Sequence, residues 1–188
     1  PTHPDEDPTR IVEDILRPIQ SMLLASRQAE QNIDIFIDCP RTLIVHIDPL
    51  RVKQIILNLA LHAMRRTRKG FIKCCVEVDK QDDGTSNIVT LAVEDTGPSI
   101  SLEDANHLLS TSPTLQDTFD LTTDHDVGGV RMGMYISKQL SDRLGGTLSF
   151  DPSYDSRYNP ISPSSSSSPS PLYRGSRFVF HFPKTTMV

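Results

Sequence analysis

The sequence lacks the features that mark several large classes of protein. It contains no apolar run approaching the roughly 20 residues needed to span a bilayer, and its N-terminus does not resemble a signal peptide. Its only cysteines are Cys39, Cys74 and Cys75; they match no zinc-binding spacing, and the adjacent pair would point to opposite faces of a strand. We therefore expect no transmembrane segment, no disulfide, no structural zinc and a reducing, cytoplasmic compartment.

An excess of positive charge is also missing. The 188 residues include 19 Lys and Arg against 24 Asp and Glu, which gives a net charge of -5 at pH 7. Proteins that bind duplex nucleic acid normally present a basic patch to the phosphates, so no nucleic-acid partner is expected. The exception is the basic run from Arg65 to Lys69, whose simplest interpretation is the solvated, cationic C-terminal end of a helix.

The hydrophobic periodicity predicts one α/β domain with a sizeable core. Because the chain begins at Pro1 without a methionine, we expect a piece of a longer protein, with a linker at 1–8 and the domain at 9–188. Main helices are predicted at 10–30, 49–68 and 130–145, with a short helix from Ser101 to about Leu109 and strands at 33–37, 43–47, 71–78, 88–93, 147–150 and 176–182. The expected architecture is a two-layer α/β sandwich in which three helices cover one face of a mixed five-stranded sheet.

Local signals predict where the helices begin and end. Asp48 and Pro49 form the start signal of the helix at 49–68, and Gly70 is expected to end it. Pro18 predicts a kink or a late start in the first helix.

Two segments are expected to lie outside the regular structure. Residues 109–128 are polar and aperiodic, which predicts a long mobile loop. The Ser/Pro-rich insertion at 152–173 cannot bury enough apolar surface to become ordered, so it is expected to be disordered.

Three separated segments carry the functional signal. They are 48–63, with Asn58 and His62 four residues apart; 93–100, with Asp95 and Gly97; and 128–140, with Gly129, Arg131 and Gly133. In this order and spacing they resemble the N box, G1 box and G2 box of the catalytic and ATP-binding domain of sensor histidine kinases, within the GHKL ATPase superfamily. With a last hairpin at Gly145-Gly146 and at Gly175 to Phe178, the resemblance covers about Thr9 to Pro183.

The resemblance implies a Bergerat-type fold that binds ATP or ADP between the N-box helix, the G1 turn and a lid at 109–128. In the family, the aspartate matched by Asp95 accepts a hydrogen bond from the adenine amino group. Gly97 keeps the first glycine of the G1 box, whereas Ser99 replaces the second.

Arg66 stands where the family often has an aromatic residue near the adenine. Its guanidinium either stacks on the base or belongs to a solvated helix end. Ile100 and Met134 complete the implied nucleotide-binding set.

The N box departs from the family at the position that handles magnesium. The family has an asparagine pair, of which the second helps to hold the Mg²⁺ that bridges the phosphates; here the pair is Asn58 and His62. Imidazole is a poor ligand for this oxygen-preferring ion, so the magnesium site is expected to be lost at His62, with Asn58 the remaining metal candidate. His62 is then either a hydrogen-bonded filler or part of a new metal site. Arg65 keeps a cation where the family often has a lysine facing the phosphates.

The G2 box is altered as well, since an arginine replaces its central glycine. Glycines at 129 and 133 let backbone N–H groups approach phosphates at a helix N-terminus. Arg131 either obstructs this approach or binds phosphate through its own guanidinium. The first alternative predicts a lowered affinity for the nucleotide phosphates, and the second predicts that affinity is retained.

No residue of the chain is expected to be the phosphoacceptor, because none of its six histidines has the required context. The acceptor is expected on upstream dimerisation helices, with a homodimer in the full-length protein and a response-regulator receiver domain as a further partner. The first hypothesis is an ATP-binding kinase domain of a two-component phosphorelay, weakened or inactive. The second is a pseudokinase, a non-catalytic interaction or dimer-regulating module. A third, a mitochondrial-type protein kinase of the same superfamily, would need a large N-terminal helical domain and a different glycine pattern.

Overall fold

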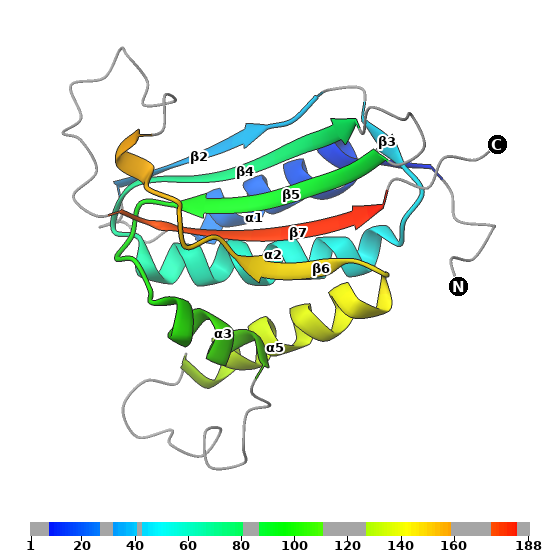
Figure 1. The fold of residues 1–188 in the computed structure, drawn as a ribbon. Coiled ribbons are helices and arrows are strands. Elements are labelled where there is room, and N and C mark those ends of the chain that lie inside the picture. Colours follow the sequence, from blue (N-terminus) through cyan, green and yellow to red (C-terminus); the bar gives the residue numbers. More distant parts are fainter. Residues whose placement is uncertain are drawn as a thin grey trace.

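A mixed five-stranded sheet forms the centre of the computed structural model (Figure 1), which describes residues 8–26, 32–40, 43–80, 87–110, 127–158 and 174–183. The strands are β2 (Asn32–Asp38), β4 (Lys69–Lys80), β5 (Asn87–Asp95), β7 (Ser176–Pro183) and β6 (Thr147–Phe150), in that spatial order. β2 runs parallel to β4, and the other pairs are antiparallel. The predicted mixed sheet is therefore confirmed.

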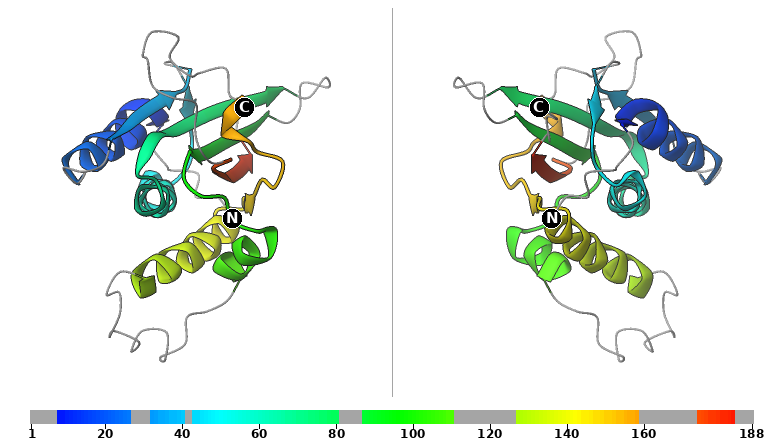
Figure 2. Two further views of the ribbon diagram at one scale, coloured as in Figure 1. Left: turned by 90° about the vertical axis from the view of Figure 1, so that its left-hand side faces the viewer. Right: turned by 90° about the vertical axis from the view of Figure 1, so that its right-hand side faces the viewer.

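The helices gather on one face of this sheet, as the two side views of Figure 2 show. They are η1 (Ile11–Leu16), a π-helix that leads into α1 (Arg17–Ser26), followed by α2 (Pro49–Arg66), α3 (Leu102–Ser110) and α5 (Val127–Arg143). The two-layer sandwich is as predicted, with the short α3 packed on α5. None of the described helices combines the length and the apolar character needed to cross a bilayer.

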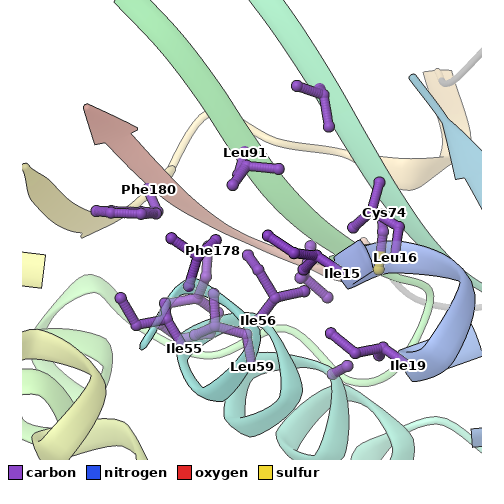
Figure 3. Close-up of a cluster of buried hydrophobic side chains, with 14 of the residues drawn as sticks. Ile15, Leu16, Ile19, Ile55, Ile56, Leu59, Cys74, Leu91, Phe178 and Phe180 are labelled. Atoms are coloured by element: carbon purple, nitrogen blue, oxygen red, sulfur yellow. The ribbon is translucent and has the colours of Figure 1, made fainter. Parts of the chain in front are cut away.

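The core lies between the sheet and the first helices (Figure 3). Alternate residues of each strand point to the helical face, which gives the strands their period of two. Phe178 and Phe180 of β7, Leu91 of β5 and Cys74 of β4 meet the apolar faces of α1 and α2 there. Burying one side of the sheet in this way leaves the strand ends free to carry polar groups.

Helix α2 follows its sequence signals at the start and departs from them at the end. Asp48 caps it, since its carboxylate accepts hydrogen bonds from the backbone N–H of Leu50 (3.0 Å) and Arg51 (3.2 Å). The helix ends at Arg66, with Thr67 as its C-cap, and Gly70 does not end it as predicted. Gly70 instead lies in β4 at φ 110°, where an added Cβ would fall 2.1 Å from Oγ1 of Thr96. Close approach, not helix termination, requires this glycine.

The N-terminal helix is described from residue 11 to residue 26, and the rest of the predicted range to residue 30 lies outside the described residues. The wide π-helical turn comes first, with the Arg17 N–H donating to the Val12 carbonyl, and the α-helix begins one residue before Pro18. A proline is tolerated in a first turn, so the expected late start takes this form.

The strand predicted at 43–47 is shorter than expected and does not join the five-stranded sheet. It comprises only β3 (Ile44–Val45), which pairs with β1 (Thr9–Arg10) in a separate two-stranded sheet. The preceding strand, β2, pairs with β4 in the five-stranded sheet.

The Ser/Pro-rich insertion starts as ordered structure. Residues 152–158 form a turn and the 3-10 helix η2 (Ser156–Tyr158), and the Ser156 N–H donates to the Arg174 carbonyl (2.7 Å). The expected disorder does not hold for these residues, because backbone hydrogen bonding anchors them. Residues 159–173 and the lid segment 111–126 lie outside the described residues.

The cap of α2 gives a first prediction. Asp48→Ala should lower the free energy of unfolding by about 1 kcal/mol in a urea titration, because two N–H groups lose their acceptor. Asp48→Asn is the matched control: it keeps the cap oxygen but loses the ion pair with Arg51, and should stay near the wild type. Equal losses in both variants would assign the effect to the ion pair and contradict the cap.

Candidate functional site

The fold brings the three sequence motifs to one side of the molecule. The C-terminal end of α2, the end of β5 and the start of β7 lie at the same end of the sheet, at the left in Figure 1, with α3 beneath them. Arg66 of α2 donates to the Pro98 carbonyl of the turn after β5. Asn58 of α2 donates to the Gly133 carbonyl of α5 (3.0 Å). Asn58 thus connects the N and G2 segments, and Arg66, which follows the N segment on α2, connects this helix to the G1 turn.

Asp95 is the centre of this arrangement. It is the last residue of β5, and its side chain lies on the helical face with 2% of its surface exposed. The Gly97 N–H donates to its Oδ1 (2.8 Å). Burial raises the pKa of Asp95 to about 7, against the opposing effects of the Gly97 N–H and the Arg66 guanidinium. A buried carboxyl that is half protonated at neutral pH is a strong sign of a polar ligand site.

The backbone around Asp95 is held by close packing on both sides. Gly97 has no space for a side chain, since an added Cβ would lie 2.9 Å from the Arg66 carbonyl oxygen. On the other side, Gly175 adopts φ 77°, and an added Cβ would lie 1.9 Å from the Asp95 carbonyl oxygen. Thr96 accepts from the Phe71 N–H through Oγ1 (3.0 Å). Sequence reasoning gave Thr96 and Gly175 no role in the site; a glycine directly before an alternating strand was the only available signal.

Arg66 is not the solvated end of a helix. Its guanidinium is half-buried and donates to Pro98, and the charges of Asp95 and Asp104 oppose the lowering of its pKa that burial causes. It therefore bridges α2 and the G1 turn beside Asp95. Arg65, one residue earlier, is exposed.

Two buried polar atoms beside Asp95 find no hydrogen-bond partner within the described part of the chain. They are Nε of Arg66 and Oγ of Ser176. Ser176 is the cross-strand partner of Asp95 in the β5–β7 register. Buried polar atoms are normally satisfied by protein, water or ligand, so this end of the sheet has the donors to complement a bound polar group.

The half of the site assigned to phosphate and magnesium is occupied by protein contacts. Both donated hydrogen bonds of the Asn58 amide go to α5, to the Gly133 carbonyl and to Oγ of Ser137 (each 3.0 Å). A Cβ on Gly133 would lie 3.1 Å from Cγ of Asn58. Gly133 therefore permits close packing of the two helices.

His62 is part of the core. Its ring is 5% exposed and stands edge-on to Phe178, with centroids 5.4 Å apart and planes at 87°. Burial, reinforced by the charges of Arg66 and Arg65, lowers the pKa of His62 to about 4, so the imidazole is neutral. Among the described residues, no group of three or more His, Cys, Asp and Glu side chains could hold a metal ion. The neutral imidazole of His62 is a poor ligand for the oxygen-preferring magnesium ion, and its packing on Phe178 favours a filler over a new metal site.

The predicted glycine loop is helical. α5 already begins at Val127, so Gly128, Gly129 and Gly133 lie within its first turns.

The remaining predicted site residues fall into different environments. Nη2 of Arg131 lies 3.4 Å from Nδ1 of His107 on α3, so the guanidinium is directed toward that helix. An added Cβ on Gly129 would meet no atom within 4 Å. Met134 is fully buried in the core, and Ile100 packs against it while partly buried.

Comparison with known proteins gives consistent results. The family described as histidine kinase-, DNA gyrase B- and HSP90-like ATPase matches residues 47–186. The sensor histidine kinase GacS of Pseudomonas protegens is 29% identical over 126 residues, which is 67% of this chain but 13% of GacS. The chain thus spans a small part of that relative's length.

Solved structures of histidine kinases share the fold. The nucleotide-free catalytic domain of the histidine kinase ThkA superposes with a TM-score of 0.64 at 22% identity, covering 96% of this chain and 98% of that one. Full-length ShkA in complex with AMPPNP superposes with a TM-score of 0.62 at 21% identity, covering 98% of this chain and 33% of ShkA.

The buried imidazole gives a second prediction. An unfolded histidine titrates near pH 6.5, whereas the pKa of His62 in the folded protein is about 4. Between these two pH values, only the unfolded chain binds a proton at this histidine. The stabilisation is complete above about pH 6.5 and is lost as pH falls toward 4, by on the order of 3 kcal/mol.

His62→Gln removes this titration while keeping a side chain of similar length. Urea titrations from pH 7.5 to 4 should show a shallower decline for the variant than for the wild type. Parallel curves would show that His62 is protonated in the folded protein and would contradict its burial as a neutral ring.

Proposed function

The chain belongs to the family of histidine kinase-, DNA gyrase B- and HSP90-like ATPases, and we propose that it is the adenine-nucleotide-binding domain of a sensor histidine kinase. Asp95 is the observation that carries the proposal. It presents a buried carboxylate at the end of a central strand, next to buried donors that find no partner among the described residues. An acceptor beside donors complements the edge of adenine, which offers an amino group next to a ring nitrogen.

The adenine half of the site is preorganised in our proposal. The Gly97 N–H orients the Asp95 carboxylate through Oδ1, so Oδ2 is the atom that receives the base amino group. Arg66 connects the end of α2 to the G1 turn and closes one side of the base position. A nucleotide bound there would supply the phosphoryl group, while the residues of this chain bind and orient the base.

The phosphate half supports the second, finer proposal that this domain is a pseudokinase. Phosphoryl transfer depends on positioning and on neutralisation of phosphate charge, usually by magnesium. Here the position of the family's second asparagine is held by His62, a neutral imidazole that packs on Phe178 and is a poor magnesium ligand. The domain would then act as an interaction or dimer-regulating module toward upstream dimerisation helices, with a receiver domain as a further partner.

Calorimetric titration with ATP and ADP, each with and without magnesium, tests the function. We expect both nucleotides to bind with affinities that magnesium leaves unchanged, because the neutral imidazole of His62 is a poor ligand for the ion. Absence of all binding would contradict the adenine site. Tight binding that requires magnesium would contradict the pseudokinase and restore the kinase.

Restoring the family's residues at two positions tests whether the substitutions there prevent magnesium-dependent ATP binding. His62→Asn with Arg131→Gly should create magnesium-dependent ATP binding, since an amide oxygen and an unobstructed helix start return together. The control combines His62→Asn with Met132→Gly, which introduces the same helix-weakening glycine at a neighbouring exposed position. Magnesium dependence in both variants, or in neither, would show that Arg131 is not the obstruction.

The raised pKa of Asp95 predicts a pH dependence of binding. Below about pH 7 the carboxyl carries a proton, so an amino group gains a weaker, uncharged acceptor. Adenosine affinity should therefore rise between pH 6 and pH 8, with release of a proton measurable as a buffer-dependent enthalpy. Asp95→Asn should bind more weakly and lose the pH dependence; an unchanged pH profile in this variant would assign the titration to another group.

A further inference from the structure

A triad of charged residues crosses three strands directly behind Asp95. Glu94 is the residue before Asp95, so its side chain points to the opposite face of the sheet. There its Oε2 pairs with Nζ of Lys73 on β4 (2.8 Å), and its Oε1 pairs with Nε of Arg177 on β7 (3.3 Å). The triad thus connects β4, β5 and β7.

The register of the sheet makes this triad adjacent to the site. Lys73, Glu94 and Arg177 are direct cross-strand partners. The next row consists of Ile72, Asp95 and Ser176 on the same three strands. Opposite charges paired across strands fix the register, and any slip would carry Asp95 with it.

Two members of the triad are buried and the third, Arg177, is half-buried, so the three charges depend on one another. The side chains of Lys73 and Glu94 are 8% and 6% exposed. Arg177 also approaches Glu77 (3.7 Å) and Asp151 (3.5 Å), and the Cys75 thiol donates to Oε1 of Glu94 (3.4 Å). Removing one member of a buried ion pair leaves its partner uncompensated and displaces the strands that carry it.

We propose that Lys73, Glu94 and Arg177 are positioning residues that hold the end of β5 so that Asp95 presents its carboxylate to the base. The inference rests on the proposed role of Asp95 as the base acceptor. Asp95 has little freedom of its own: Gly175 contacts its carbonyl, and the Gly97 N–H must reach its Oδ1. A shift of β5 relative to β7 therefore changes the carboxylate directly.

The test compares this triad with another contact on the same two strands. Glu94→Gln removes the central charge, and Lys73→Met removes one partner while the Glu94–Arg177 pair remains. The matched control is Thr90→Val. Thr90 lies four residues before Glu94 on the same face of β5. Its Oγ1 contacts Nδ1 of its cross-strand partner His181 (2.9 Å).

Two readouts on the intact chain separate positioning from general stability. One is adenosine affinity below the melting transition of each variant, and the other is the titration of the Asp95 carboxyl by NMR, which needs no ligand. We expect Thr90→Val to lower Tm only. Glu94→Gln and Lys73→Met should weaken adenosine binding by about tenfold and move the Asp95 titration toward the value of an ordinary aspartate.

The outcomes distinguish this inference from the proposed function. If the wild type binds no adenosine, the proposed function fails, and the Asp95 titration still decides whether the triad positions the carboxyl. Lower Tm values with wild-type affinity and wild-type Asp95 titration in both triad variants would overturn the inference. Failure of both variants to fold, with Thr90→Val folded, would make the triad a folding element and would also overturn it.

Discussion

The burial of one carboxyl group, that of Asp95, is the constraint on which the site depends. An aspartate taken out of water at a strand end must be compensated, and here the Gly97 N–H and the nearby Arg66 charge supply part of the compensation. The strands on either side are fixed to accommodate it: Gly175 packs against its carbonyl, and Thr96 ties the turn to β4. The pKa of about 7 shows that protein groups alone compensate the charge incompletely.

The two halves of the site have different physical characters. Around Asp95, buried donors that find no partner among the described residues leave hydrogen-bonding capacity for a ligand. Along α2 and α5, the side-chain N–H groups of Asn58 bond α5, and the His62 ring packs on Phe178. The same helix that would present magnesium ligands therefore contributes to the core. In the proposed pseudokinase, the packing of His62 would take the place of metal binding at this position.

Sequence patterns predicted elements whose causes are local. Asp48 and Pro49 start α2 through their own backbone geometry, and the alternation in β5 and β7 reflects a sheet covered on one face. They failed where the cause lies in another segment. Gly70 is required by the close approach of Thr96 and does not end α2. Arg66 was left between two interpretations because its partner, Pro98, lies beyond the next strand pair.

The central claim is that affinity comes from the base and not from a magnesium-bound phosphate chain. The most direct measurement is the ratio of the dissociation constants of adenosine and of ATP in excess magnesium, determined by calorimetry on the same preparation. The account predicts that the two constants agree within about tenfold, because the neutral imidazole of His62 is a poor ligand for magnesium. ATP bound about a hundredfold or more tightly than adenosine, only when magnesium is present, would contradict it.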